Sequence, residues 1–70
     1  MDPGQQIREA LDNLRNVGLA NCVPWHVISG SIRRLSARLQ PGVGIEDYLN
    51  DHRAQYIRSF ELKCGSHPNP

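Results

Sequence analysis

Apolar residues recur every three or four positions in three stretches of this chain, and glycine or proline separates the stretches. This spacing places apolar side chains on one side of an α-helix, whereas a half-buried strand needs strict alternation. The apolar side of the third stretch also carries His52. The residues in question are Ile7, Leu11 and Leu14, then Trp25, Ile28, Ile32, Leu35 and Leu39, and finally Ile45, Tyr48, Leu49, Tyr56 and Phe60. The pattern predicts helices over about residues 3–17, 24–40 and 45–61.

The residues at the ends of these stretches support the same boundaries. Asp2 can cap a helix whose first residue is Pro3, a position where the missing proline N–H costs nothing. Gly18 is typical of a left-handed residue that ends a helix. Pro24 marks the start of the second helix, and Pro41 forces the residue before it out of the helical region.

Short connections between helices favour antiparallel neighbours, so the sequence predicts an all-α, compact three-helix bundle with up-down-up topology. Seventy residues allow a single domain. A chain of this size buries only about 60% of the surface that its unfolded form exposes, so its stability margin is thin. We expect one helical domain over residues 1–62 and a disordered, flexible tail over residues 63–70, which contains two prolines.

The first residues, MDPGQQIREALDN, contain neither the basic region nor the apolar region of a secretion signal. No stretch approaches the roughly 18 apolar residues of a membrane span. We therefore expect no membrane association and a cytoplasmic location, with the nucleus as an alternative. Thiols in these compartments are mostly kept reduced.

Two cysteines are each followed closely by a histidine, Cys22 by His26 and Cys64 by His67. In an up-down-up bundle both pairs would lie at the same end. Three interpretations stay open: a zinc site made of the four side chains, a Cys22–Cys64 disulfide, or unlinked residues with Cys22 as a small buried apolar side chain. We favour the third and predict no metal, because the commoner Cys-x-x-Cys half-site is absent and the expected compartment is reducing.

The second helix carries three arginines and no acidic residue. Arg33, Arg34 and Arg38 lie around Gly30 and Ala37, on the side opposite the apolar stripe. Arginines beside small residues suit close approach of a partner protein, so we expect these five residues to bind one, with a homodimer as one form. The alternative is a nucleic-acid-binding domain that uses the three arginines on phosphates, which the net charge of only +1 disfavours.

The chain contains no phosphate-binding glycine loop, nucleophile elbow or metalloprotease motif. His52 is expected at the edge of the core, and Asp47 and Asp51 on a solvated acidic side of the third helix. A core this small also leaves little room for a deep pocket. We therefore expect no enzymatic activity and no cofactor.

Overall fold

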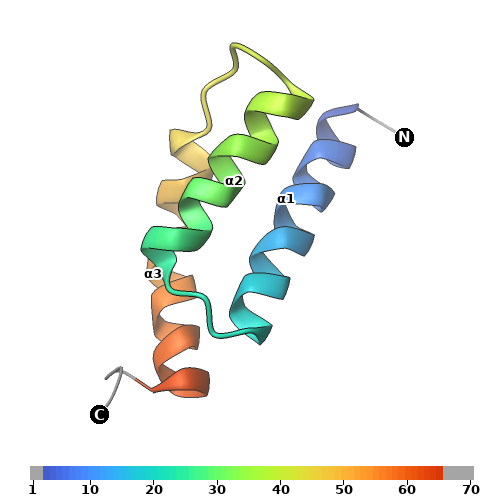
Figure 1. The fold of residues 1–70 in the computed structure, drawn as a ribbon. Coiled ribbons are helices and arrows are strands. Elements are labelled where there is room, and N and C mark those ends of the chain that lie inside the picture. The colour runs from blue at the N-terminus through green and yellow to red at the C-terminus, as the bar shows by residue number, and fades with distance from the viewer. Residues whose placement is uncertain (1–2, 66–70) are drawn as a thin grey trace.

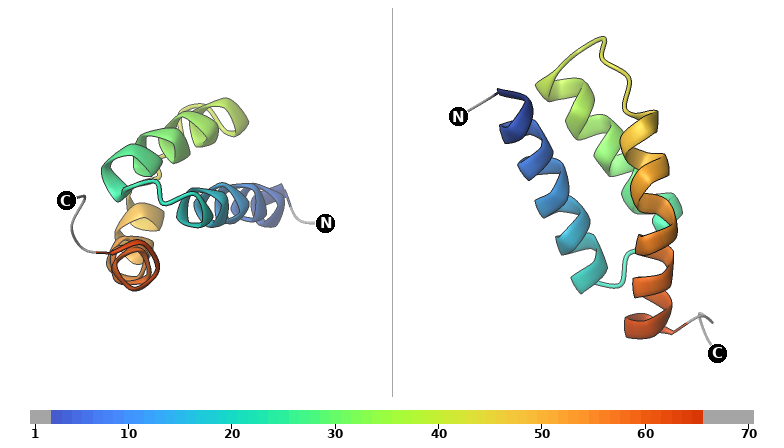
Figure 2. Two further views of the ribbon diagram at one scale, coloured as in Figure 1. Left: turned by 60° about the horizontal axis from the view of Figure 1, so that its bottom comes forward. Right: turned by 180° about the vertical axis from the view of Figure 1, so that it is seen from behind.

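The computed structural model describes residues 3–65, and that part of the chain forms three helices without a strand. α1 spans Pro3–Ala20, α2 spans Trp25–Leu39 and α3 spans Glu46–Cys64. Figure 1 shows α1 and α2 side by side and running in opposite directions, with α3 behind α2. Each helix contacts the other two, and Figure 2 shows that α3 runs in the same direction as α1. The predicted all-α, up-down-up bundle is confirmed.

The described helices are too short or too polar to cross a membrane. α1 and α3 contain 18 and 19 residues respectively, but neither has a continuous apolar segment of that length. Both carry charged residues along their length, as expected for helices with a water-exposed side.

The end of α1 differs from the prediction. Gly18 is not a left-handed terminator, because the helix continues to Ala20. The reason for a glycine at this position is the approach of α2: a Cβ atom at Gly18 would lie 2.5 Å from Cδ1 of Ile28. Glycine is therefore needed here for close packing of two helices and not for a turn.

The left-handed residue that ends α1 is Cys22, with φ of 56°. The Cys22 N–H donates to the Leu19 carbonyl oxygen at 3.1 Å, and the Val23 N–H donates to the Gly18 carbonyl oxygen at 2.8 Å. This pair of hydrogen bonds is the Schellman motif, in which glycine usually occupies the left-handed position. A cysteine there bears a backbone cost that glycine would not.

The other helix ends lie close to their predicted positions, with one exception. Pro24 precedes the first residue of α2, and Ile45 precedes that of α3. α3 was predicted to end at residue 61 but reaches Cys64. Residues 63 and 64, expected in a flexible tail, thus belong to the last turn of α3, while residues 66–70 lie outside the described part.

The core is small. Tyr56 is its largest member, and its hydroxyl donates a hydrogen bond to the Val23 carbonyl oxygen in the α1–α2 connection. Trp25 packs against the Tyr56 ring with 5.3 Å between ring centroids. Burial of the Tyr56 side chain raises the pKa of its hydroxyl. In the described part of the chain, the buried apolar residues are Leu11, Ile28, Ile32, Leu49 and Tyr56.

Candidate functional site

The five residues predicted to bind a partner lie on the part of α2 that faces away from the core. Arg33, Arg34, Ala37 and Arg38 are exposed, and Gly30 is half-buried. A Cβ atom at Gly30 would meet nothing within 4 Å, so packing within the bundle gives no reason for glycine there. Glycine inside a helix costs about 1 kcal/mol relative to alanine.

Arg33 lies at the edge of this surface and contacts α3. Its Nε lies 3.1 Å from Oε2 of Glu46, and its terminal nitrogen lies 3.2 Å from Oε1. The two hydrogen bonds make a forked pair, the strongest arrangement for arginine and a carboxylate. The hydrogen bonds from Arg33 lower the pKa of Glu46 and raise that of Arg33. Because both side chains are exposed, we expect the pair to orient Arg33 more than to stabilise the fold.

Arg34 and Arg38 differ from Arg33 in having no acidic partner among residues 3–65. Within residues 3–65, the only ion pairs are those of Arg15 with Asp12 and of Arg33 with Glu46. Arg34 donates a long hydrogen bond of 3.5 Å to the hydroxyl of Ser31 on the same helix. The structure thus leaves two guanidinium groups, one helical turn apart, available to an acidic group from outside.

The cysteines predicted to lie at one end of the bundle are joined. Cys22 and Cys64 form a disulfide with 5.8 Å between their Cα atoms, which links the α1–α2 connection to the last turn of α3. Cys22 is exposed, so its interpretation as a buried apolar side chain is wrong. Zinc needs thiolate sulfurs, and the two sulfurs of a disulfide do not supply them.

The zinc interpretation also needs two histidines, and the structure describes only one of them. His26 is exposed on the first turn of α2, and His67 lies outside the described residues. In the described part of the chain, no three His, Cys, Asp or Glu side chains are placed to hold a metal ion.

A polar cluster between α1 and α3 was not predicted. The Tyr48 hydroxyl donates to Oδ1 of Asp12 at 2.5 Å, and Arg15 donates to the same oxygen at 3.3 Å. The Nε of Arg15 also donates to the Tyr48 oxygen at 3.4 Å. His52 packs against the Tyr48 ring with 4.3 Å between ring centroids. These contacts tie α1 to α3 from residues far apart in the sequence.

The electrostatics of this cluster follow from its hydrogen bonds. Partial burial opposes ionisation of Asp12, but the hydrogen bonds from Tyr48 and Arg15 outweigh it and lower the pKa of the carboxyl group. Burial, and then donation to the Asp12 carboxylate, raise the pKa of Tyr48. The hydrogen bonds of the cluster link α1 to α3, which gives it a structural role in the bundle.

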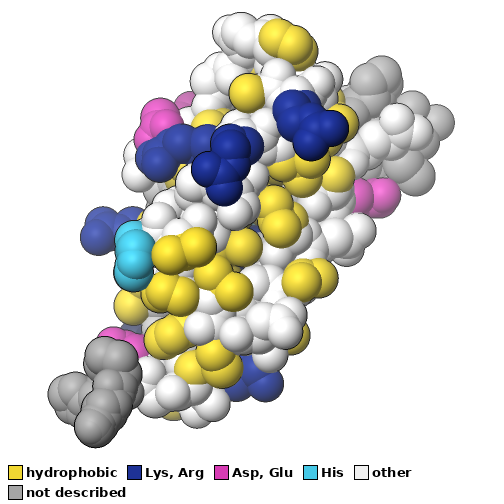
Figure 3. Space-filling view, in the orientation of Figure 1, with side chains coloured by type: hydrophobic (Ala, Val, Ile, Leu, Met, Phe, Trp, Pro, Cys, Tyr) yellow, Lys and Arg dark blue, Asp and Glu magenta, His cyan; other side chains and the backbone are white. Residues whose placement is uncertain are grey.

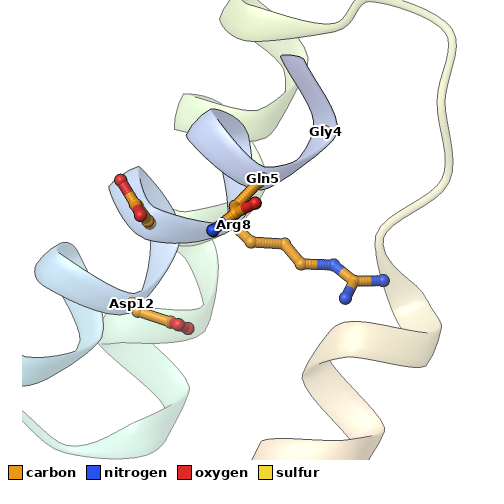
Figure 4. A pocket seen from close by; sticks show the side chains of 5 residues that line it. Gly4, Gln5, Arg8 and Asp12 are labelled. Atoms are coloured by element: carbon orange, nitrogen blue, oxygen red, sulfur yellow. The ribbon is translucent and has the colours of Figure 1, made fainter. Parts of the chain in front are cut away.

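An open hollow lies beside this cluster, near the start of α1. It is lined by Gly4, Gln5, Arg8, Glu9 and Asp12. Figure 4 shows Arg8 extending away from α1 toward the α3 side of the hollow. The hollow is formed largely by the surface of one helix, so it does not enclose a substrate as catalytic pockets do.

Comparison with known proteins gives no relative. No family model, curated protein or solved structure matches the chain.

Proposed function

We propose that this protein is a small, non-enzymatic interaction module that binds a partner protein through the outward side of α2. The observation that supports this proposal is the set of exposed arginines on a helix without any acidic residue. Arginine is over-represented among the residues that contribute most to protein interfaces. Two of the arginines have no ion-pair partner within residues 3–65.

The small residues on α2 favour a protein partner. Gly30 and Ala37 leave space on the helix between the arginine side chains, and nothing in the bundle fills the space at Gly30. A partner backbone or a small side chain could approach α2 closely there. Such helix-on-helix or helix-in-groove contacts are common modes of recognition.

Nucleic acid is the weaker alternative. Arg33 is already paired with Glu46, and Asp47 follows directly in the first turn of α3, so carboxylates border the basic surface. These charges would repel phosphates near Arg33. A net charge of +1 adds little long-range attraction for a polyanion.

Charge reversal on α2 tests the proposal. We expect Arg34→Glu with Arg38→Glu to abolish capture of the partner from the source cells, identified by mass spectrometry against wild type. The matched control is Arg53→Glu with Arg58→Glu, at two exposed arginines on α3. It changes the total charge by the same amount. Capture that is unchanged in the α2 variant, or lost equally in the control, would show that the binding surface is elsewhere.

Gel retardation with DNA and RNA at low salt tests the alternative. Phosphate-driven binding weakens steeply as salt rises, with a slope set by the number of contacts. We expect no retardation. Retardation that disappears in the Arg34→Glu, Arg38→Glu variant would favour the nucleic-acid function instead.

The proposed location is the cytoplasm, with the nucleus as the alternative. The Cys22–Cys64 disulfide argues against both, because both compartments keep thiols reduced. Disulfides persist mainly in oxidising compartments. Alkylation of thiols in intact source cells, followed by a non-reducing gel, measures the state of Cys22 and Cys64 where the protein works. A fully oxidised pool would contradict a reducing compartment.

A further inference from the structure

Two exposed valines, which we call the apolar strip, lie on the same side of the molecule as Arg34 and Arg38. Val17 on α1 and Val27 on α2 are 57% and 47% exposed. They directly precede Gly18 and Ile28, and the Ile28 side chain packs closely over Gly18. The two valines therefore flank this contact, one from each helix.

The same flank can be followed along both helices, because residues at spacings of four, three and four share one side of a helix. Each helix contributes a row of four such residues. The row on α1 carries no charge, and the row on α2 begins with an apolar and a polar residue and ends with two arginines. We call these two rows the α1–α2 face. It consists of Gln6, Ala10, Asn13 and Val17 from α1, and of Val27, Ser31, Arg34 and Arg38 from α2.

Figure 3 shows the side of the molecule formed by α1 and α2. Hydrophobic side chains cover its middle and lower part, basic side chains gather near the top, and acidic side chains appear only at its edges. The apolar part thus lies toward the start of α2 and the basic part toward its end. An occupant of this face needs an apolar region and, next to it, negative charge.

We propose that the α1–α2 face binds an acidic amphipathic helix of a partner protein. The apolar stripe of that helix would cover Val17 and Val27, and carboxylates one turn apart would pair with Arg34 and Arg38. Fork-shaped pairing with carboxylates fits the geometry of arginine, and burial of the valines supplies the non-directional part of the affinity. This inference rests on the proposed function, since it names the partner class for the same arginines.

A second copy of this chain fits the face less well. Asp47 and Asp51 on α3 are exposed and one turn apart, so they could meet the two arginines. The same side of α3 continues with Ala54 and Arg58. If Asp47 meets Arg38 and Asp51 meets Arg34, Arg58 is placed toward the apolar strip, where a cation is desolvated without a partner.

A synthetic peptide tests the inference on the intact, oxidised protein. The probe is a helix of about 18 residues with leucines along one stripe and glutamates beside it. We expect saturable binding with Kd below about 1 mM, amide shifts in NMR spectra confined to the α1–α2 face, and weakening as salt rises from low to physiological concentration. A peptide with glutamine in place of glutamate is the matched control and should bind at least about tenfold more weakly.

Variants locate the contact. We expect Arg34→Glu with Arg38→Glu to weaken the glutamate peptide by at least about tenfold, and Arg53→Glu with Arg58→Glu to have little effect. Val17→Asp with Val27→Asp should also weaken it, while Val43→Asp, at an exposed valine in the α2–α3 connection, should not. Circular dichroism of each variant checks that the helices are retained.

The outcomes separate this inference from the proposed function. If capture of the natural partner depends on Arg34 and Arg38 but the peptide does not bind, or shifts residues elsewhere, the acidic helix is refuted and the interaction surface stands. If capture does not depend on the arginines, both fail. Dimerisation that rises with protein concentration and is lost in the same arginine variant would assign the face to a second copy and overturn the inference.

Discussion

Loss of the Cys22–Cys64 disulfide should remove much of the stability of this protein. The two cysteines are 42 positions apart, and the entropy of closing a loop of this length in the unfolded chain corresponds to about 4 kcal/mol. A domain of this size has a total free energy of unfolding of about 4 to 10 kcal/mol. We therefore expect the Cys22→Ser, Cys64→Ser variant to be marginally folded at room temperature.

Urea unfolding followed by far-UV circular dichroism measures this loss, with oxidised wild type, reduced wild type and the double variant compared at one pH. Reduced wild type and the variant should agree, and both should show a lower midpoint than the oxidised protein. The slope of the transition should increase as well, because an unfolded chain without the cross-link exposes more surface.

A second variant tests the backbone argument separately. Cys22 holds a left-handed conformation with φ of 56°, and serine would bear the same cost there. Glycine would not, so Cys22→Gly with Cys64→Ser should be more stable than the double serine variant by about 1 kcal/mol. The reasoning is refuted if air-oxidised protein contains two titratable thiols, or if reduction leaves the midpoint unchanged.

Three further changes probe the packing. Gly18→Ala should destabilise the fold by about 1 to 3 kcal/mol in urea unfolding, because the new methyl group would overlap Ile28; an unchanged midpoint would mean that the helices separate without cost. Tyr56→Phe leaves the Val23 carbonyl oxygen without its hydrogen bond and should cost about 1 to 3 kcal/mol in the same assay, whereas a neutral result would show that water replaces the hydroxyl. The pKa of Asp12 is lowered in the folded protein, so its contribution to stability is present above the pKa of the unfolded chain and is lost as pH falls through the folded value. Asp12→Asn should therefore flatten the fall in stability at acidic pH, and identical pH profiles for variant and wild type would contradict this assignment.

The number, order and direction of the helices could be predicted from the sequence because they depend on local periodicity. Ile28 and Ile32 were identified as core positions by spacing alone, and both are buried. The end of α1 could not be predicted in the same way. Whether Gly18 ends a helix or admits a neighbour depends on how closely Ile28 approaches, and residue spacing within α1 carries no information on that distance.

The candidate site shows the same limit. The exposure of Arg34 and Arg38 follows from their positions on α2, so it could be predicted. The pairing of Arg33 with Glu46 depends on the rotation of α2 relative to α3, which no local pattern fixes. The hydrogen bond between Tyr48 and Asp12, 36 positions apart, has the same origin.

The cysteines are an intermediate case. Up-down-up topology predicted that Cys22 and Cys64 approach one end of the bundle, and they do. Their pairing is not favoured by the sequence, because the expected compartment is reducing. The extra turn of α3 carries Cys64 to the α1–α2 connection.

The position of the disulfide also decides which part of the chain a protease can separate. The bond encloses α2 and α3, whereas α1 precedes Cys22 and is held to them, apart from the continuous chain, by packing and by the hydrogen bonds with Tyr48. A single cut in the exposed segment 41–44 between α2 and α3 would therefore leave both pieces covalently attached, while a cut at Asn21 would leave α1 free to dissociate. The α2–α3 connection is thus the place where new termini or an inserted peptide can be introduced with the two helices still linked.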